Sequence, residues 1–231
     1  MKQLLLLLLA ALPLAAAAQT PIDTTYRYQL GLTASPQLNK FFTANRSLPL
    51  GLLYKRQVKP TQAVRARLVG QYSRRDTANY AQVQDGTGIR EWQLDAYVGY
   101  EWQRLLRKRF SWYYGAEVGA GIGRLNQREV VAWSNSNGPY QYDWRYTGKR
   151  WQVQLRPFAG LQVALTSRLS VLAETAAPLT YRKLNDQARG TGMQTLADGS
   201  YVPSGGTAYY KYTRTSFAWR PIQLIGLSFR L

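Results

Sequence analysis

Strict alternation between apolar and polar residues is the feature that most constrains what this sequence can fold into. In the segment 91–102 the apolar side chains occupy the even positions, from Trp92 and Leu94 to Val98 and Trp102. A period of two places successive side chains on opposite faces of a β-strand. No segment has convincing helical periodicity. The alternation recurs in eight segments, approximately 26–35, 48–56, 63–73, 91–102, 111–124, 150–165, 169–181 and 217–231.

The connections between these segments alternate in length. Those after the second, fourth and sixth segments are short, at 57–62, 103–110 and 166–168. The other four are long, at 36–47, 74–90, 125–149 and 182–216. Outer-membrane barrels have short periplasmic turns and long outer loops. We therefore predict an all-β fold, a single up-and-down antiparallel transmembrane β-barrel of about eight strands, with both chain ends on the periplasmic side. Within the last long connection, Asp198-Gly199 and Ser204-Gly205-Gly206 predict turns.

The first residues have the order of a secretory signal. Lys2 precedes an apolar run from Leu4 to Leu14, and small residues at Ala16 and Ala18 precede polar residues. We expect residues 1–18 to be a signal peptide and residues 19–231 to form the barrel domain. An N-terminal membrane helix is the alternative, but the run is short for the ~20 residues that a span requires. The predicted localisation is the cell outer membrane.

Aromatic residues on the apolar face gather near the ends of the predicted strands. The 11 residues from Trp92 to Trp102 match the ~9–11 that a tilted strand needs to cross the hydrocarbon. Aromatic rings at both ends favour the two membrane–water interfaces. The alternative is an exported soluble ligand carrier, which would turn its apolar face inward. The predicted lipid-interface girdle consists of Tyr54, Trp102, Trp112 and Phe229 at one rim and Tyr72, Trp92 and Trp151 at the other.

The opposite face mixes glycine with charges of both signs. We expect these charges to pair in the lumen, because an eight-stranded barrel is just wide enough for side chains to fill it. Arg220, Arg230 and Glu91 belong to the same face. The predicted lumen charge network consists of Arg27, Lys55, Arg65, Arg67, Asp95, Glu101, Glu117, Arg156 and Glu174.

The last twelve residues, Arg220 to Leu231, resemble the terminal strand of outer-membrane barrels. Gly226, Phe229 and Leu231 match that family's assembly signal, whereas Leu224 stands where the signal has a polar residue. The segment 156–171 also resembles a hairpin of small OmpA/OmpX-like barrels. The resemblance implies the outer-membrane protein β-barrel fold and insertion by the barrel assembly machinery.

The formal net charge of +18 favours anionic partners. For an exported protein we expect outer-membrane lipid and lipopolysaccharide rather than nucleic acid. The long loops combine Lys and Arg with aromatic residues, which suits an anionic glycan or lipid phosphate. The alternative is that these loops only pack on one another above the membrane. The sequence sets no oligomeric state.

The chain has no cysteine and no histidine. The second absence removes Ser-His and Asp-His mechanisms and most zinc sites, so we expect no enzyme, no metal and no cofactor. Asp95, Glu101 and Glu117 could form a carboxylate pair, but such residues are more often structural ion pairs. The predicted function is a structural or surface-interaction role in the outer membrane. The alternative is a narrow porin-like channel or transporter for small solutes.

Overall fold

The computed structural model describes residues 27–35, 49–76, 86–135, 138–196 and 199–231. Within these residues no helix is long and apolar enough to cross a membrane. The predicted signal peptide, residues 1–18, lies outside the described residues. All described strands pair antiparallel with their neighbours. The strands are β1 (Tyr28–Ala34), β2 (Leu50–Lys59), β3 (Gln62–Asp76), β4 (Gly86–Arg107), β5 (Phe110–Asn135), β6 (Gly138–Ala164), β7 (Leu169–Ala176), β8 (Leu179–Thr195), β9 (Tyr201–Phe217) and β10 (Arg220–Arg230).

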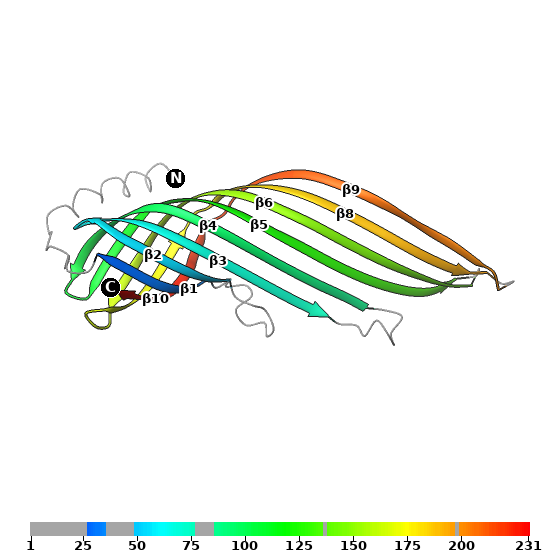
Figure 1. Ribbon diagram of the computed structural model, residues 1–231, viewed down its shortest axis with the longest axis horizontal. Coiled ribbons are helices and arrows are strands. Elements are labelled where there is room, and N and C mark those ends of the chain that lie inside the picture. The colour runs from blue at the N-terminus through cyan, green and yellow to red at the C-terminus, as the bar shows by residue number, and fades with distance from the viewer. Residues whose placement is uncertain (1–26, 36–48, 77–85, 136–137, 197–198) are drawn as a thin grey trace, which may run out of the picture.

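Eight of these strands close into a ring, in the order β1, β2, β3, β4, β5, β6, β7 and β10 (Figure 1). Closure occurs at β1, where Leu30 lies opposite Tyr54 of β2 and Phe229 of β10. The first and last strands begin and end at the same rim, because Leu231 N donates a hydrogen bond to Tyr28 O at 2.9 Å. The predicted up-and-down barrel of eight strands is confirmed. A closed ring leaves no unpaired strand edge, which the bilayer interior requires.

The seventh and eighth strands of the sequence prediction are each divided in two. β7 and β8 pair with β6 in one continuous register, from Ala176 opposite Phe158 to Leu179 opposite Leu155. Pro178 lies between them and has no N–H to donate to a ladder. The register of β10 against β7 also shifts between Arg220 and Leu224. Beyond these breaks, β8 and β9 leave the ring as a hairpin attached to β6.

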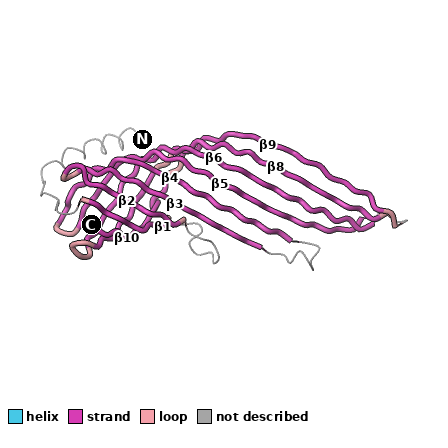
Figure 2. The backbone as a smooth tube through the Cα atoms, in the orientation of Figure 1, coloured by secondary structure: helices cyan, strands magenta, loops and turns pink. Residues whose placement is uncertain are grey.

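The prediction of long loops at 125–149 and 182–216 is wrong. Both segments continue as strands, and we name the sheet that they form the arm (Figures 1 and 2). β5 and β6 stay paired from Phe110 opposite Val163 to Asn135 opposite Gly138. The 13 residues of β5 after Ile122 extend roughly 40 Å along the strand at ~3.4 Å per residue. Of the other two predicted loops, residues 36–47 lie outside the described residues. The loop predicted at 74–90 is too long, because β3 continues to Asp76 and β4 begins at Gly86, and residues 77–85 lie outside the described residues.

The arm forms strands because its sequence alternates as strictly as the barrel does. Tyr140, Tyr142 and Trp144 share one face of β6, and their rings stack with centroids 6.1 and 5.7 Å apart. These rings lie over Gly190 and Gly192 of β8, where an added Cβ would collide with the tyrosine side chains. Aromatic rings packed over glycines in this way stabilise a sheet that has little other cover.

Of the two turns predicted in the segment 182–216, one is present and the other is not. Gly199 has a φ of 79° and donates a backbone hydrogen bond to Leu196 O at 3.0 Å, so a turn joins β8 to β9 there. The segment from Ser204 to Gly206 is instead part of strand β9, opposite Gly190 to Gly192 of β8.

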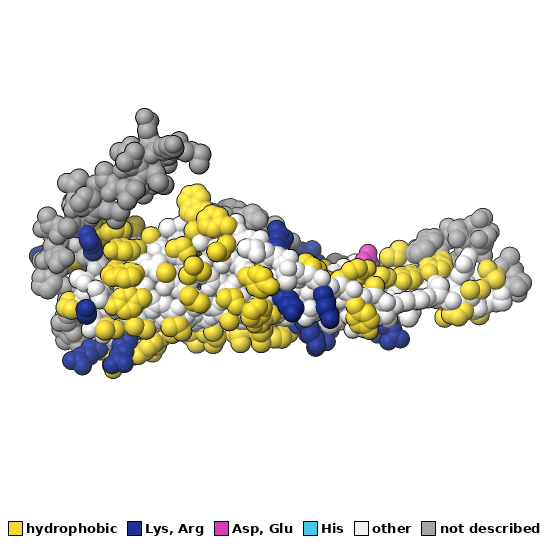
Figure 3. All heavy atoms as spheres, turned by 90° about the horizontal axis from the view of Figure 1, so that it is seen from above, with side chains coloured by type: hydrophobic (Ala, Val, Ile, Leu, Met, Phe, Trp, Pro, Cys, Tyr) yellow, Lys and Arg dark blue, Asp and Glu magenta, His cyan; other side chains and the backbone are white. Residues whose placement is uncertain are grey.

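The barrel turns its apolar side chains outward and its polar ones inward. Leu94 and Val118 are 42% and 58% exposed, whereas Asp95 and Glu117, one position away on the same strands, are buried. A soluble ligand carrier would have the opposite polarity, so that alternative is excluded. Figure 3 shows the apolar belt, with Lys and Arg side chains gathered at both of its ends.

Candidate functional site

Arg65 of β3 lies at the centre of the lumen, fully buried among three carboxylates. Its Nη1 donates hydrogen bonds to Glu101 Oε2 at 3.0 Å and to Glu174 Oε2 at 2.9 Å. Its Nε lies 2.6 Å from Glu117 Oε1. Lys55 Nζ donates to Glu101 Oε1 at 2.8 Å from the neighbouring strand. The strands that carry these groups are held together across the lumen.

The outer layer of the same network consists of two further arginines. Arg156 of β6 pairs with Glu117, and its Nη2 lies 3.2 Å from Glu174 Oε1. Arg67 Nη2 lies 3.5 Å from Glu117 Oε2. We name this cluster of seven side chains the plug. Its members are Lys55, Arg65, Arg67, Glu101, Glu117, Arg156 and Glu174.

Aromatic rings fill the space around the plug. The Arg65 guanidinium lies 4.1 Å from the Phe158 ring centroid, and Lys55 Nζ lies 4.3 Å from that of Tyr113. Tyr97 contacts Arg67 in the same way at 4.5 Å. Cations over aromatic faces are stabilised most where water is excluded. The lumen is therefore filled with side chains at this level.

Two members of the predicted lumen network lie apart from the plug. Asp95 is buried nearer the outer mouth and accepts hydrogen bonds from Gln93 Nε2 at 2.6 Å and Gln152 Nε2 at 2.7 Å. Arg27 is exposed at the opposite, periplasmic mouth, beside Arg230. The sequence analysis did not include the glutamines and the aromatic residues of the lumen in the predicted network. Their positions in the alternation nevertheless place them on the face that points into the lumen.

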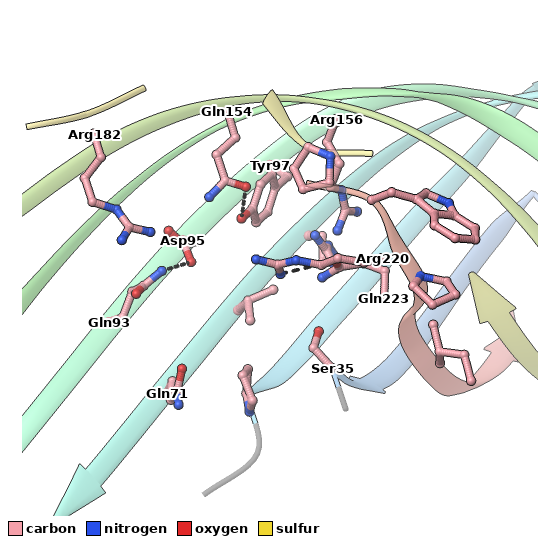
Figure 4. Close-up of a pocket in the computed structure, with 17 residues that line it drawn as sticks. Ser35, Gln71, Gln93, Asp95, Tyr97, Gln154, Arg156, Arg182, Arg220 and Gln223 are labelled. Atoms are coloured by element: carbon pink, nitrogen blue, oxygen red, sulfur yellow. Dashed lines mark hydrogen bonds between the residues drawn. The ribbon is translucent and has the colours of Figure 1, made fainter. Parts of the chain in front are cut away.

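Two cavities lie on opposite sides of the plug among the described residues. The outer cavity has a volume of about 510 Å³, and Arg67 and Arg156 of the plug line it (Figure 4). The inner cavity has a volume of about 40 Å³, and Lys55 lines it. The plug therefore separates two openings.

The three glutamates of the plug are all engaged in ion pairs. Glu101, Glu117 and Glu174 are each ion-paired with Lys or Arg. No group of three or more acidic side chains among the described residues is placed to hold a metal ion. A general acid or base must exchange protons with a substrate, and these three carboxylates instead accept hydrogen bonds from cations.

The predicted girdle residues lie on the outer surface in two groups. Trp92 lies directly opposite Tyr72 on the neighbouring strand. At the other rim, the rings of Trp102 and Tyr114 stack with centroids 5.7 Å apart. Six of the seven girdle residues are exposed and Trp112 is half-buried. The exposed six are Tyr54, Tyr72, Trp92, Trp102, Trp151 and Phe229.

A row of exposed cations lies just beyond the outer group of the girdle. Arg74 follows Tyr72 by two residues, and Arg90 precedes Trp92 by two, so each cation shares the outward face with its aromatic neighbour. The same step separates Lys149 from Trp151 on β6 and Lys183 from Tyr181 on β8, whereas Arg124 of β5 follows the apolar Ile122. We name this row the basic collar. Its members are Arg74, Arg90, Arg124, Lys149 and Lys183, and all five are exposed.

Strand register places two pairs of collar cations opposite each other, whereas Arg124 also lies opposite the girdle residue Trp92 on β4. Arg74 lies opposite Arg90, and Arg124 lies opposite Lys149. Lys183 lies opposite Trp151. Sequence reasoning missed the collar because it assigned these residues to strand edges and loops. The sequence does contain a usable pattern, because each predicted girdle residue of the outer rim has a cation two positions farther from the membrane.

The predicted assembly-signal residues lie on the strand that closes the ring. Gly226 faces the lumen, where an added Cβ would come within 2.7 Å of Leu32 O. Phe229 faces outward with Ile225 and Leu227. Leu231 follows the strand and is hydrogen-bonded to β1.

A closed ring with an apolar outside, charged inside and aromatic rims identifies the architecture. The fold is that of a small outer-membrane β-barrel. It places the protein in the outer membrane, with the short turns at one rim and the arm beyond the other.

Similar barrels are found among solved structures. A major outer membrane protein from Thermus thermophilus has 10% identity and a TM-score of 0.45, over 90% of this chain and 100% of that one. CarO from Acinetobacter baumannii has 10% identity and a TM-score of 0.37, over 92% and 98%. Ail, the attachment invasion locus protein of Yersinia pestis, has 15% identity and a TM-score of 0.35, over 89% and 97%. No protein-family model and no curated protein matches the sequence.

Asp143 of the arm is expected to titrate below its ordinary range. Arg128 Nη2 and Arg145 Nη2 lie 2.6 and 3.1 Å from Asp143 Oδ2. Partial burial opposes ionisation, but these hydrogen bonds outweigh it and hold the pKa of the carboxyl below 3.8. Because the folded-state pKa is lowered, the contacts stabilise the hairpin above pH ~4, and that contribution is lost as the pH falls through the folded pKa.

Carboxyl-carbon NMR titration of Asp143 measures this pKa directly. Replacing both arginines, Arg128→Gln with Arg145→Gln, should return the pKa to its ordinary value. An unchanged pKa in the double variant would show that the two guanidinium groups do not set it.

Proposed function

We propose that the protein is a non-conducting outer-membrane barrel whose basic collar binds the phosphate groups of lipopolysaccharide and whose arm contacts anionic glycan. The observation that carries the proposal is the exposed, outward-facing position of the collar. Its five cations all face outward, at or immediately beyond the aromatic rim. At that height the headgroup phosphates of the outer leaflet lie against the barrel wall, within reach of long Arg and Lys side chains.

The arm supports the second half of the proposal. Strand β9 exposes Tyr209, Tyr210 and Tyr212, and Lys211 and Arg214 lie among them. Apart from the collar residues Lys149 and Lys183, the segments 125–149 and 182–216 together hold six Lys or Arg and four Asp or Glu. Aromatic rings beside cations suit sugars that carry carboxylate or phosphate groups. A sheet that extends well beyond the membrane displays these groups to the cell surface.

The plug supports a non-conducting lumen rather than the alternative narrow channel. Ions would have to pass a layer where charged side chains and aromatic rings contact one another across the barrel. Fixed charges of both signs, paired with one another, leave no row of like charges to select an ion.

Two matched triple variants test the proposal. The collar variant combines Arg124→Gln, Lys149→Gln and Lys183→Gln. The arm variant combines Arg145→Gln, Arg189→Gln and Lys211→Gln, and removes the same charge farther from the membrane. Both are refolded in detergent, and the binding of purified lipopolysaccharide and of polygalacturonate is measured by calorimetry at two salt concentrations.

The collar variant should lose affinity for lipopolysaccharide by roughly a hundredfold, at about 1 kcal/mol for each cation near an anionic surface. The arm variant should retain that affinity and lose binding of polygalacturonate. Wild-type binding of both should weaken with salt, because exposed charges are screened. Equal loss of lipopolysaccharide binding in both variants would contradict a specific collar, since it would reflect net charge alone.

A further inference from the structure

The outer cavity has the size and position of a ligand site. It opens above the plug at the outer mouth of the barrel, and its volume of about 510 Å³ lies within the ~300–1,000 Å³ of small-molecule pockets. Seven of the ten described strands or their ends contribute to its lining, from Ser35 after β1 to Gln223 of β10. A site made by so many strands is held rigidly by the closed ring.

Four arginines face this cavity against a single acid. Arg67 and Arg156 form its floor, and Arg182 and Arg220 enter from β8 and β10. In Figure 4 the side chains of Arg156, Arg182 and Arg220 point toward the middle of the cavity from different sides. Asp95, the only acidic residue among the described residues of the lining, accepts hydrogen bonds from two glutamines. The cavity therefore carries an excess of positive charge.

The two floor arginines have buried donors without partners. Arg67 and Arg156 are 3% and 1% exposed, yet Nε and Nη1 of each lack a hydrogen-bond acceptor. Glu117 serves both arginines, and the plug has four cations for three carboxylates. A buried donor without a partner costs about 1–3 kcal/mol, and more when it is charged. These nitrogens have almost no exposed surface, so an anion in the cavity would offset the uncompensated charge of the two arginines rather than accept from the covered donors.

The remaining lining indicates what else such an anion carries. Gln71, Gln93, Gln154 and Gln223 supply neutral donors and acceptors, and Gln154 Oε1 already accepts a hydrogen bond from Tyr97 at 3.1 Å. Val69, Ile222 and Trp219 add apolar surface. Apolar walls with a few convergent polar groups are typical of sites for small organic molecules.

We propose that the outer cavity is a binding site for a small organic anion, a carboxylate or phosphate ester, held by Arg67, Arg156, Arg182 and Arg220. The planar guanidinium groups match the oxygens of either anionic group in bidentate fashion. The site is distinct from the collar, since it lies inside the barrel mouth and the collar lies on the outer wall. It would let the non-conducting barrel capture a solute from the medium.

Fluorine NMR with three small probes tests the site. The probes are 4-fluorophenyl phosphate, 4-fluorobenzoate and the neutral 4-fluorobenzyl alcohol, added to refolded protein that has never contacted lipopolysaccharide. Wild-type protein should broaden the resonances of both anions and leave the alcohol sharp. Binding of the alcohol as tightly as the anions, or of no probe, would overturn the proposal.

Arg182→Gln combined with Arg220→Gln is the decisive variant, because neither residue belongs to the plug and the barrel should remain folded. Each of the two arginines is expected to supply one charge-assisted hydrogen bond that raises the affinity roughly tenfold. The anions should therefore bind the double variant about a hundredfold more weakly. Arg67→Gln is the second variant, and it should weaken binding while heat-dependent gel mobility reports whether the barrel is intact. Unchanged affinity in the Arg182/Arg220 double variant would refute the site.

The collar variant separates this site from the lipopolysaccharide proposal, because it should bind the fluorinated anions as wild-type protein does. Added lipopolysaccharide distinguishes the two sources of phosphate. Probe binding that persists at saturating lipopolysaccharide assigns the site to a free solute. Displacement of the probe would assign it to a lipid headgroup.

Discussion

Replacing Arg65 with alanine is expected to lower the free energy of unfolding by about 3–5 kcal/mol, the cost of removing one partner from a buried ion pair. The loss should be large because Arg65 serves Glu101, Glu117 and Glu174 at once, and all four side chains are buried. The alanine variant would leave three carboxylates close to one another, with one cation fewer, in a medium of low dielectric constant.

Urea titration in lipid vesicles, followed by tryptophan fluorescence, measures this effect. Arg124→Ala is the matched control, because Arg124 is exposed on the outer wall and its removal should change stability by less than about 1 kcal/mol. Arg65→Lys should lie between the two, since a single ammonium group cannot reach all three carboxylates. If Arg65→Ala is no more destabilising than Arg124→Ala, the plug does not hold the barrel together.

Replacing charged residues of the plug with small ones is expected to convert a non-conducting barrel into a channel. The proposed variant changes Arg65, Arg156, Glu117 and Glu174 to serine, which removes equal numbers of positive and negative charges. Smaller side chains would join the outer and inner cavities through a polar, hydrated passage. In planar bilayers the wild-type protein should show no discrete openings, and the serine variant should show them.

A matched control removes the same charges from the arm, by changing Arg128, Arg145, Asp143 and Asp186 to serine. This variant should remain silent. If the quadruple plug variant fails to insert, Arg65→Ser with Glu174→Ser tests the same passage with less disruption. Discrete openings of the wild-type protein would favour the porin-like alternative, and a folded but silent plug variant would show that other residues close the lumen.

The two faces of the barrel could be predicted from the sequence because lipid enforces them. Lipid on one side and a narrow lumen on the other require strict alternation, so Leu94 and Val118 point outward and Asp95 and Glu117 point inward. The alternation predicts which face of a strand a residue occupies, but not how far along the barrel axis that residue lies. Arg27 was therefore predicted to belong to a network that it does not reach.

The arm could not be predicted from the same reasoning, because a membrane span needs only ~9–11 residues. The predicted strands stopped at the girdle, and everything beyond it was counted as loop. Tyr140 to Tyr146 alternate as clearly as Trp92 to Trp102, which was a usable signal. Placing Arg182 in a loop also concealed its position over the outer cavity.

Pairing within the lumen depends on register, which alternation alone does not provide. Glu174 of β7 meets Arg65 of β3 across the barrel, 109 residues earlier in the chain. Their contact follows from the closure of β10 between β1 and β7, and from the height that each strand takes in the ring. The members of the plug could be predicted as lumen residues, but their partners could not.

Spin labels at single positions measure most directly which side of each strand meets lipid. Because the chain has no cysteine, Leu94→Cys, Val118→Cys and Arg189→Cys each accept one nitroxide. In vesicles, the labels at positions 94 and 118 should collide with oxygen and be shielded from a water-soluble nickel chelate, whereas the label at 189 should be open to the chelate. Equal access of the chelate to all three positions would contradict a barrel whose apolar face lies against lipid.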